Sequence, residues 1–256
     1  MKKAKVIIFD LDGTAVDSPA QKLPTERLQK AVRALEANYY LCAATGRVWS
    51  FAEPVIKGLG LADPCIISAG TQICDPVTGE ILWQQLIEEA QLPQVLSIMK
   101  STGYNVTAND STEMDYLDGG WPFERIANLK EAYFLELAFV PEDKAAAVLE
   151  MFKDIPNTHT TMVVAQRPGM RDIHIMHNLA NKQHAIFELC NMLEVDRAQC
   201  IGIGDGHNDM DLFTAVGHKV AMGNAVQDLK EASDRVIGSI QEDGLAEYFE
   251  ELASAS

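Results

Sequence analysis

The sequence predicts an α/β fold, in which a parallel sheet is covered by helices and a second, mixed unit is inserted into it. Two observations support this. Near both ends of the chain, apolar runs of strand length alternate with segments of helical periodicity, the rhythm of parallel strands joined by helices. Between them, neighbouring extended runs replace this alternation, as in an α+β unit. We therefore predict a core from residues 1–82 and 181–256 and an inserted unit from residues 83–180.

The predicted core strands are short apolar runs that end at turn residues. The first, Val6-Ile7-Ile8-Phe9, stops at Asp10 and is followed by Gly13. A continuous apolar run of this length is typical of a strand buried on both faces of a sheet. By the same pattern we predict strands at 40–44, 65–67, 200–203 and 220–222, and helices at 28–35 and 185–193.

The predicted inserted unit has a different order of helices and strands. We predict a helix over 87–102 with an interruption at Pro93, and then a mixture of extended runs and one further helix. The extended runs are 104–107, 133–140, 159–165 and 172–177, and the second helix is 141–152.

Composition excludes several classes of protein. The 256 residues include 21 Lys and Arg against 37 Asp and Glu, a net charge of −16, which argues against binding to nucleic acid. No apolar run approaches the roughly 20 residues that span a bilayer. The five cysteines form no C-x-x-C pair, so neither a disulfide framework nor a structural zinc site is indicated. We expect a cytoplasmic protein without a membrane partner, and the sequence sets no oligomeric state.

Two acids follow the first predicted strand, Asp10 and Asp12, in the segment Asp-Leu-Asp-Gly-Thr. A period of two puts both carboxylates on one side if the extended backbone continues, and ligands of open α/β sheets bind at the carboxyl ends of strands. Two acids this close repel each other unless a cation compensates, which favours a hard ion such as Mg²⁺. The alternative is a solvated turn, since Asp and Gly are common turn residues.

A second acidic segment follows the predicted strand 200–203. Asp205 stands at the expected mouth of a helix and Asp209 about one turn later, so both can share one metal neighbourhood. The alternative is that Asp205 or Asn208 caps the helix. Capping a helix requires only one acid, however, and this segment contains three: Asp205, Asp209 and Asp211.

Two weaker signals accompany the acids. Thr45-Gly46-Arg47 leaves a strand, where a hydroxyl and free backbone N–H groups can hold phosphate oxygens. Lys182 begins a predicted helix and, taken alone, reads as a solvated surface lysine. What strengthens both is position, because each falls at a strand exit or a helix entrance of the same predicted sheet.

Taken together, the four segments resemble the four motifs of the haloacid dehalogenase-like superfamily: Asp-x-Asp-Gly-Thr, Thr-Gly-Arg, a lone Lys, and Gly-Asp-x-x-Asn-Asp. The resemblance covers essentially the whole chain and implies a Rossmann-like core. The insert resembles the type IIB cap of the Cof-type sugar-phosphate phosphatases, as does the run Met222-Gly223-Asn224-Ala225. Two departures are Gln183, where that family usually has Gly, and Ser68-Ala69-Gly70, where Asn-Gly is common.

The resemblance implies a role for each motif residue. Asp10 would be the nucleophile, forming an aspartyl-phosphate, and Asp12 the general acid and base. Mg²⁺ would be held by Asp10, the main-chain carbonyl of Asp12, and Asp205, with Asp209 in support. The phosphoryl group would be bound by four residues: Thr45, Gly46, Lys182 and Asn208.

The predicted function is therefore a Mg²⁺-dependent phosphatase acting on a small phosphorylated metabolite, above all a sugar phosphate. Two alternatives stay open: a phosphomutase or phosphotransferase acting on sugar phosphates, and a non-enzymatic regulator phosphorylated on Asp10. Asp12 and Lys182 count against the regulator, because a passive sensor needs neither a leaving-group acid nor a complete clamp.

The cap is expected to close over the site and choose the leaving group, as lids do. Candidate contacts, each read first as a surface charge or a packing residue, are Arg47, Trp121, Arg125, Arg167, Arg171 and His174. A zinc site at His174, His177 and His184 is not favoured, because residues three apart on an extended strand face opposite sides.

Overall fold

The computed structural model describes residues 5–17, 23–109, 115 and 118–255. The chain divides into two compact units. We call them the core unit, Met1–Trp83 with Asn181–Ser256, and the inserted unit, Gln84–Ala180. Each is described by itself. The α/β class with an inserted α+β unit, predicted from the sequence, is confirmed.

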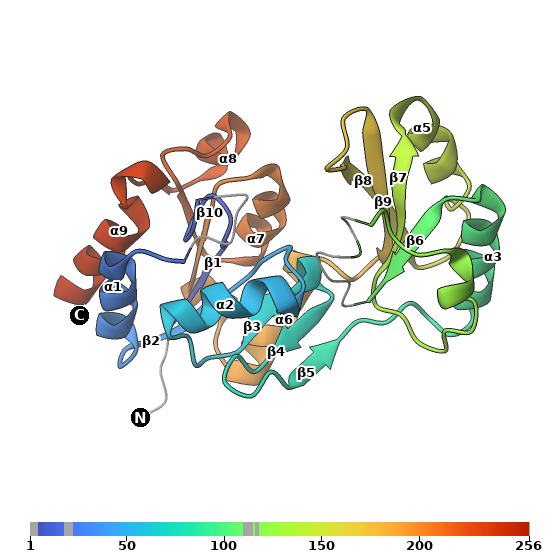
Figure 1. Cartoon of the computed structure of the whole chain (residues 1–256). Coiled ribbons are helices and arrows are strands. Elements are labelled where there is room, and N and C mark those ends of the chain that lie inside the picture. The colour runs from blue at the N-terminus through green and yellow to red at the C-terminus, as the bar shows by residue number, and fades with distance from the viewer. Residues whose placement is uncertain (1–4, 18–22, 110–114, 116–117, 256) are drawn as a thin grey trace. The chain divides into compact units, whose positions relative to one another are not determined.

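The core unit is built on a five-stranded parallel sheet (Figure 1). The strand order is β12-β11-β10-β1-β2, so β1 lies between β10 and β2. Val6 to Phe9 of β1 are fully buried, which explains why this strand reads as an unbroken apolar run. The strands are β1 (Lys5–Phe9), β2 (Tyr39–Ala43), β10 (Cys200–Gly204), β11 (His218–Ala221) and β12 (Arg235–Val236).

Helices of the core unit pack on this sheet through apolar faces. In α1 the buried residues recur at helical spacing from Leu28 to Leu35, and the Thr25 side chain caps the first turn. Helix α1 packs against α9, and α6 against α7. The helices are α1 (Glu26–Leu35), α2 (Trp49–Leu59), α6 (Lys182–Leu193), α7 (Met210–Ala215), α8 (Gln227–Ala232) and α9 (Gly244–Ser254). Short 3₁₀ turns are η1 (Ser68–Gly70), η3 (Arg197–Gln199), η4 (His207–Asp209) and η5 (Ile240–Glu242).

The predicted strand at 65–67 forms, but in a different setting. It is β3 (Cys65–Ile67), which runs antiparallel to β4 (Gln72–Cys74) in a separate three-stranded sheet completed by β5 (Ile81–Gln84). A single parallel bridge, Ala44 to Ile66, joins β3 to the chain just after β2. Strands β4 and β5 were not predicted from the sequence.

The inserted unit is a four-stranded antiparallel sheet in the order β6-β7-β9-β8, with its own apolar core (Figure 1). Its strands are β6 (Asn105–Ala108), β7 (Leu135–Pro141), β8 (Thr158–Val164) and β9 (Met170–His177). Its helices are α3 (Leu92–Thr102) and α5 (Glu142–Glu150), with the 3₁₀ turn η2 (Phe123–Arg125). In the part of the chain that the structure describes, no helix is both long and apolar enough to cross a membrane.

The prediction of a helix from residue 87 was wrong at its start. Helix α3 begins at Leu92, with Pro93 in its first turn. Proline has no N–H and disfavours helical backbone in the residue before it, so it starts a helix more readily than it interrupts one. Ile87 instead donates its N–H to the Ala132 carbonyl at 2.7 Å, outside any helix.

The turn η1 bears directly on where α6 starts. Three successive residues have positive φ: 51° at Ser68, 57° at Ala69 and 95° at Gly70. A Cβ on Gly70 would lie 2.2 Å from the Asn181 carbonyl carbon. Glycine is therefore needed for two reasons, a left-handed backbone and a close approach to the first residues of α6.

We predict that Gly70→Ala destabilises the core unit by about 2 kcal/mol or more, because a backbone clash adds to the unfavourable φ. Gly60→Ala is the matched control, since Gly60 also has a positive φ (77°) but open space around its Cβ position. The control should cost about 1 kcal/mol. Urea unfolding followed by circular dichroism measures both. Equal losses in the two variants would contradict the clash.

Candidate active site

Asp10 stands where β1 leaves the sheet, between the ends of its two neighbouring strands. Its N–H donates to the Ile203 carbonyl at 3.0 Å, and the Ala44 N–H donates to the Phe9 carbonyl at 2.9 Å. The residue is 3% exposed. The sheet register thus brings residues 44–45 and 204–205 to either side of Asp10, at the carboxyl edge where open α/β sheets bind ligands.

Lys182 joins Asp10 to the second acidic segment. Its Nζ lies 2.7 Å from Asp10 Oδ1 and 2.6 Å from Asp209 Oδ1, and all three side chains are buried. The lysine is placed by the start of α6, where the Asn181 side chain accepts the His184 N–H at 2.8 Å. The alternative interpretation of Lys182 as a solvated surface lysine is therefore wrong.

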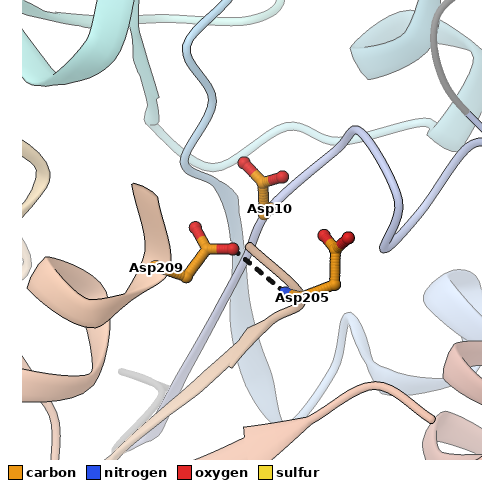
Figure 2. Close-up of side chains that lie close together, drawn as sticks. All are labelled: Asp10, Asp205 and Asp209. Carbon is orange, nitrogen blue, oxygen red and sulfur yellow. Dashed lines mark hydrogen bonds between the residues drawn. The ribbon is translucent and has the colours of Figure 1, made fainter. Parts of the chain in front are cut away.

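The segment after β10 orients two acids differently. Asp209 Oδ2 accepts the N–H groups of Asp205 at 3.0 Å (Figure 2) and Gly206 at 3.1 Å. Because Lys182 bonds Oδ1, both oxygens of Asp209 are engaged. Asp205 Oδ1 accepts the Thr14 hydroxyl at 3.0 Å. Asp209 thus holds the loop and the lysine, whereas Asp205 is less buried and contacts neither of them through its carboxylate.

Burial and mutual repulsion raise the pKa values of the clustered acids. Burial raises the pKa of Asp10 to about 7, against the opposing pull of Lys182, and the charge of Asp209 adds to the rise. Burial likewise raises the pKa of Asp205 to about 6. Burial alone would lower the pKa of Lys182, but the two carboxylates outweigh it and the pKa is raised, so the lysine stays charged. The site concentrates more negative charge than one lysine neutralises.

Asp10, Asp205 and Asp209 can together face a cation. One carboxylate oxygen from each lies within 4.8 Å of the others, and the three side chains converge in Figure 2. An all-oxygen donor set is what hard divalent cations such as Mg²⁺ and Ca²⁺ take. Among the residues that the structure describes, this is the one cluster of acids, histidines or cysteines with such spacing.

Asp12 is not part of this cluster and forms an ion pair with Arg47. Arg47 Nε donates to Asp12 Oδ2 at 2.8 Å and Nη2 donates to Asp12 Oδ1 at 2.6 Å. A third donor, Nη1, reaches the Phe51 carbonyl at 3.1 Å. This two-pronged geometry fixes the plane of the Asp12 carboxylate. The pairing raises the pKa of Arg47.

The predicted phosphate-binding residues flank the acids. Thr45 is fully buried, and its hydroxyl oxygen accepts the Arg47 N–H at 3.1 Å, which leaves the hydroxyl hydrogen free to donate. Gly46 is exposed, with open space where a Cβ would stand. Asn208 is also exposed, in η4, with its Oδ1 against Gly206.

Two further polar residues support the acids and were given no role from the sequence. Thr14 bonds Asp205, and Asn224 Nδ2 donates to the Gly13 carbonyl at 2.8 Å and lies 3.4 Å from Asp205 Oδ2. Asn224 Oδ1 in turn accepts the Ile240 N–H at 2.9 Å. Both lie in motif segments singled out above, which was the available signal, but their partners are distant in sequence.

Most residues of the inserted unit that were considered as substrate contacts interact with other residues of the same unit. The guanidinium of Arg125 lies 4.1 Å from the ring centre of Trp121, and Arg167 lies at the same distance from Phe139. Arg171 pairs with Glu142. His174 Nε2 lies 3.0 Å from Glu136 Oε2.

We predict that Lys182→Met lowers the free energy of unfolding by about 3–5 kcal/mol, because it leaves two buried carboxylates without their partner. The loss should be smaller near pH 5 than near pH 8, since Asp10 can then take up a proton. Lys57→Met is the control, because Lys57 forms an exposed ion pair with Glu53 at 2.6 Å. It should change stability by less than about 1 kcal/mol. Urea titrations at both pH values give the comparison, and equal effects of the two variants would refute it.

Comparison with curated proteins gives relatives along nearly the full chain. The 5-amino-6-(5-phospho-D-ribitylamino)uracil phosphatase YwtE of Bacillus subtilis is 23% identical, over 98% of this chain and 98% of that protein. The HMP-PP phosphatase of Serratia proteamaculans is 24% identical, over 96% of this chain and 94% of that protein. The predicted enzyme class, a phosphoric monoester hydrolase, is confirmed.

Solved structures share the fold. A haloacid dehalogenase-like hydrolase from Bacteroides thetaiotaomicron superposes with a TM-score of 0.77 at 21% identity, covering 98% of this chain and 100% of the other. A subclass IIB sugar phosphatase gives a TM-score of 0.72 at 22% identity, covering 97% and 98%. The model of the haloacid dehalogenase-like hydrolases matches residues 7–249. The chain therefore belongs to the haloacid dehalogenase-like hydrolase family.

Proposed function

We propose that this enzyme is a Mg²⁺-dependent phosphatase that hydrolyses a small phosphorylated metabolite, a sugar phosphate above all, through a phosphoryl group carried on Asp10. The observation that carries the proposal is the buried constellation of Asp10, Lys182 and Asp209 with Asp205 beside it. The names of these relatives support the substrate class, because each refers to a small phosphorylated compound or a sugar phosphatase.

The acids fit a magnesium ion. Three carboxylates within 4.8 Å and two raised pKa values describe a site whose charge a divalent cation would relieve. Asp10, Asp205 and the main-chain carbonyl of Asp12 would hold the ion, with Asp209 in support. When bound, Mg²⁺ supplies charge neutralisation between the carboxylate nucleophile and the anionic phosphate.

Asp10 is the proposed nucleophile. Its carboxylate oxygen attacks phosphorus, the bond from phosphorus to the sugar oxygen breaks, and the sugar leaves as an alcohol after receiving a proton. Water then attacks the phosphorylated Asp10, releasing inorganic phosphate and regenerating the carboxylate. Lys182 keeps a positive charge 2.7 Å from Asp10 Oδ1 and so favours the ionised, nucleophilic form.

Asp12 is the proposed proton donor to the leaving oxygen and the acceptor from the attacking water. Both of its oxygens accept hydrogen bonds from Arg47 in the described geometry. Proton transfer therefore requires Arg47 to release at least one of them. The Asp12 side chain keeps 33% of its surface exposed, in contrast to 4% for Asp10, so a leaving group and water can reach it.

Thr45, Gly46, Lys182 and Asn208 are the proposed ligands of the phosphoryl oxygens. Thr45 offers its unused hydroxyl hydrogen, Gly46 its exposed backbone, and Asn208 an exposed amide. These residues recognise a phosphoryl group, but none of them distinguishes one leaving alcohol from another. We therefore propose that the inserted unit, Gln84–Ala180, which the sequence predicted as residues 83–180, supplies the side chains that select the metabolite.

The direct test is phosphate release from a panel of phosphorylated sugars, polyols, nucleotides and small acids, with and without Mg²⁺. We expect Mg²⁺-dependent release from one or a few compounds, and a loss of roughly a thousandfold or more in Asp10→Asn. Asp211→Asn, which alters an exposed acid of α7, is the control and should keep full activity.

Three results would contradict the proposal. A folded wild type that releases no phosphate from any compound would exclude this substrate class. Phosphate moved between hydroxyls of one sugar would identify a phosphomutase, and phosphate retained on Asp10 would identify a regulator.

Metal binding is tested separately by thermal unfolding. Because the folded-state pKa of Asp10 is raised from 3.8 to about 7, the stability that protonated Asp10 contributes is present below pH 3.8 and lost as pH rises through 7. Protons compete with a metal for the same oxygens. We therefore expect Mg²⁺ to raise the melting temperature more near pH 8 than near pH 5, and Asp205→Asn to reduce the rise. No Mg²⁺-dependent shift at either pH would refute the metal site.

A further inference from the structure

A cavity lies in the core unit at the amino-terminal edge of the five-stranded sheet. It has a volume of about 340 Å³. Residues at strand starts line it, among them Lys5 of β1, Tyr39 of β2 and Arg235 of β12. The acidic cluster lies at the carboxyl ends of β1 and β10, so this cavity and the candidate active site are at opposite edges of the sheet.

The walls of this cavity combine aromatic rings with cations. Tyr39 and Tyr248 are only 6% and 7% exposed. Lys5 Nζ lies 5.9 Å from the ring centre of Tyr39, and the Arg235 guanidinium lies 5.0 Å from that of Tyr248. The buried side chain of Val220 adds apolar surface. The floor therefore suits a flat, apolar group.

The cavity is lined mainly by positive charges, although the chain as a whole is negative. Three Lys and Arg side chains line it against one acid, Asp234, in a protein of net charge −16. Arg235 pairs with Glu251 at 2.6 Å, and Asp234 Oδ2 accepts the Lys219 N–H at 2.8 Å. Lys5 and Lys219 form no ion pair with any residue in the described ranges. Two lysines thus keep uncompensated charge at the rim.

We propose that this cavity is a second ligand site, which binds a small organic anion carrying an aromatic ring. The ring would lie against Tyr39 and Tyr248, and the carboxylate, sulfate or phosphate group would bind Lys5 and Lys219. The volume is within the range of roughly 300–1,000 Å³ typical of small-molecule sites. The anionic group is favoured because the two lysines lack carboxylate partners among the residues that the structure describes. The ring is favoured because Tyr39, Tyr248 and Val220 give the wall an apolar surface.

The test uses 4-nitrophenyl sulfate, an aromatic anion that is not a phosphomonoester. Binding is measured by isothermal titration calorimetry, and its location by ¹H–¹⁵N NMR of the whole protein. We expect saturable binding that shifts the amide signals of Lys5, Val220 and Arg235. The double variant Lys5→Gln with Lys219→Gln should weaken it at least tenfold. The control, Lys30→Gln with Lys57→Gln, removes the same charge from exposed helix positions and should leave binding unchanged.

Sodium sulfate alone should bind at least tenfold more weakly than the aromatic ester, because it makes no use of the rings. Four results would overturn the proposal: no saturable binding, equal binding of sulfate, equal weakening in the control variant, or NMR shifts confined to Gly46 and Asn208. The first would show that the cavity takes no aromatic anion. The last would place the probe in the candidate active site instead.

Discussion

The ion pairs of Lys182 with Asp10 and Asp209 are the interaction on which the rest of the site depends. They join three segments that are remote in sequence, the end of β1, the start of α6 and the turn after β10. Two carboxylates buried this deeply are unfavourable without a positive partner. Because Asp209 also accepts N–H groups of Asp205 and Gly206, the same lysine indirectly fixes the loop that carries Asp205.

Close backbone approach is the second requirement of this arrangement. A Cβ on Gly13 would lie 2.1 Å from Asp205 Oδ2, and one on Gly204 would lie 2.5 Å from Asp209 Oδ2. Gly70 plays the same part against the first residues of α6. The glycines of the motifs thus do more than make turns, because they leave the space in which the acids and the lysine meet.

Two acids only two residues apart have been given opposite environments. Asp10 is buried against Lys182, whereas Asp12 is partly exposed and bound through both oxygens to Arg47. Such a division of environment is how neighbouring carboxylates acquire different chemical tasks. It agrees with the proposed division between a nucleophile and a proton-transfer group. At the opposite edge of the same sheet, the rings and lysines around Tyr39 and Tyr248 form a second polar and aromatic surface.

The sequence by itself determined the α/β class, the main strands of the core, and the edge of the sheet at which Asp10, Thr45 and Asp205 gather. These follow from local patterns, since apolar runs predict strands and residues just after parallel strands share one edge. Only the tertiary structure decided the partners of Lys182, the pairing of Arg47 with Asp12, and the support of Asp205 by Thr14 and Asn224. It also decided that β3 joins a small antiparallel sheet and that α3 starts at Leu92, with Pro93 in its first turn rather than at a bend. The reason is physical: a residue's local pattern sets its backbone and burial, whereas its partner is set by long-range packing that brings distant segments together.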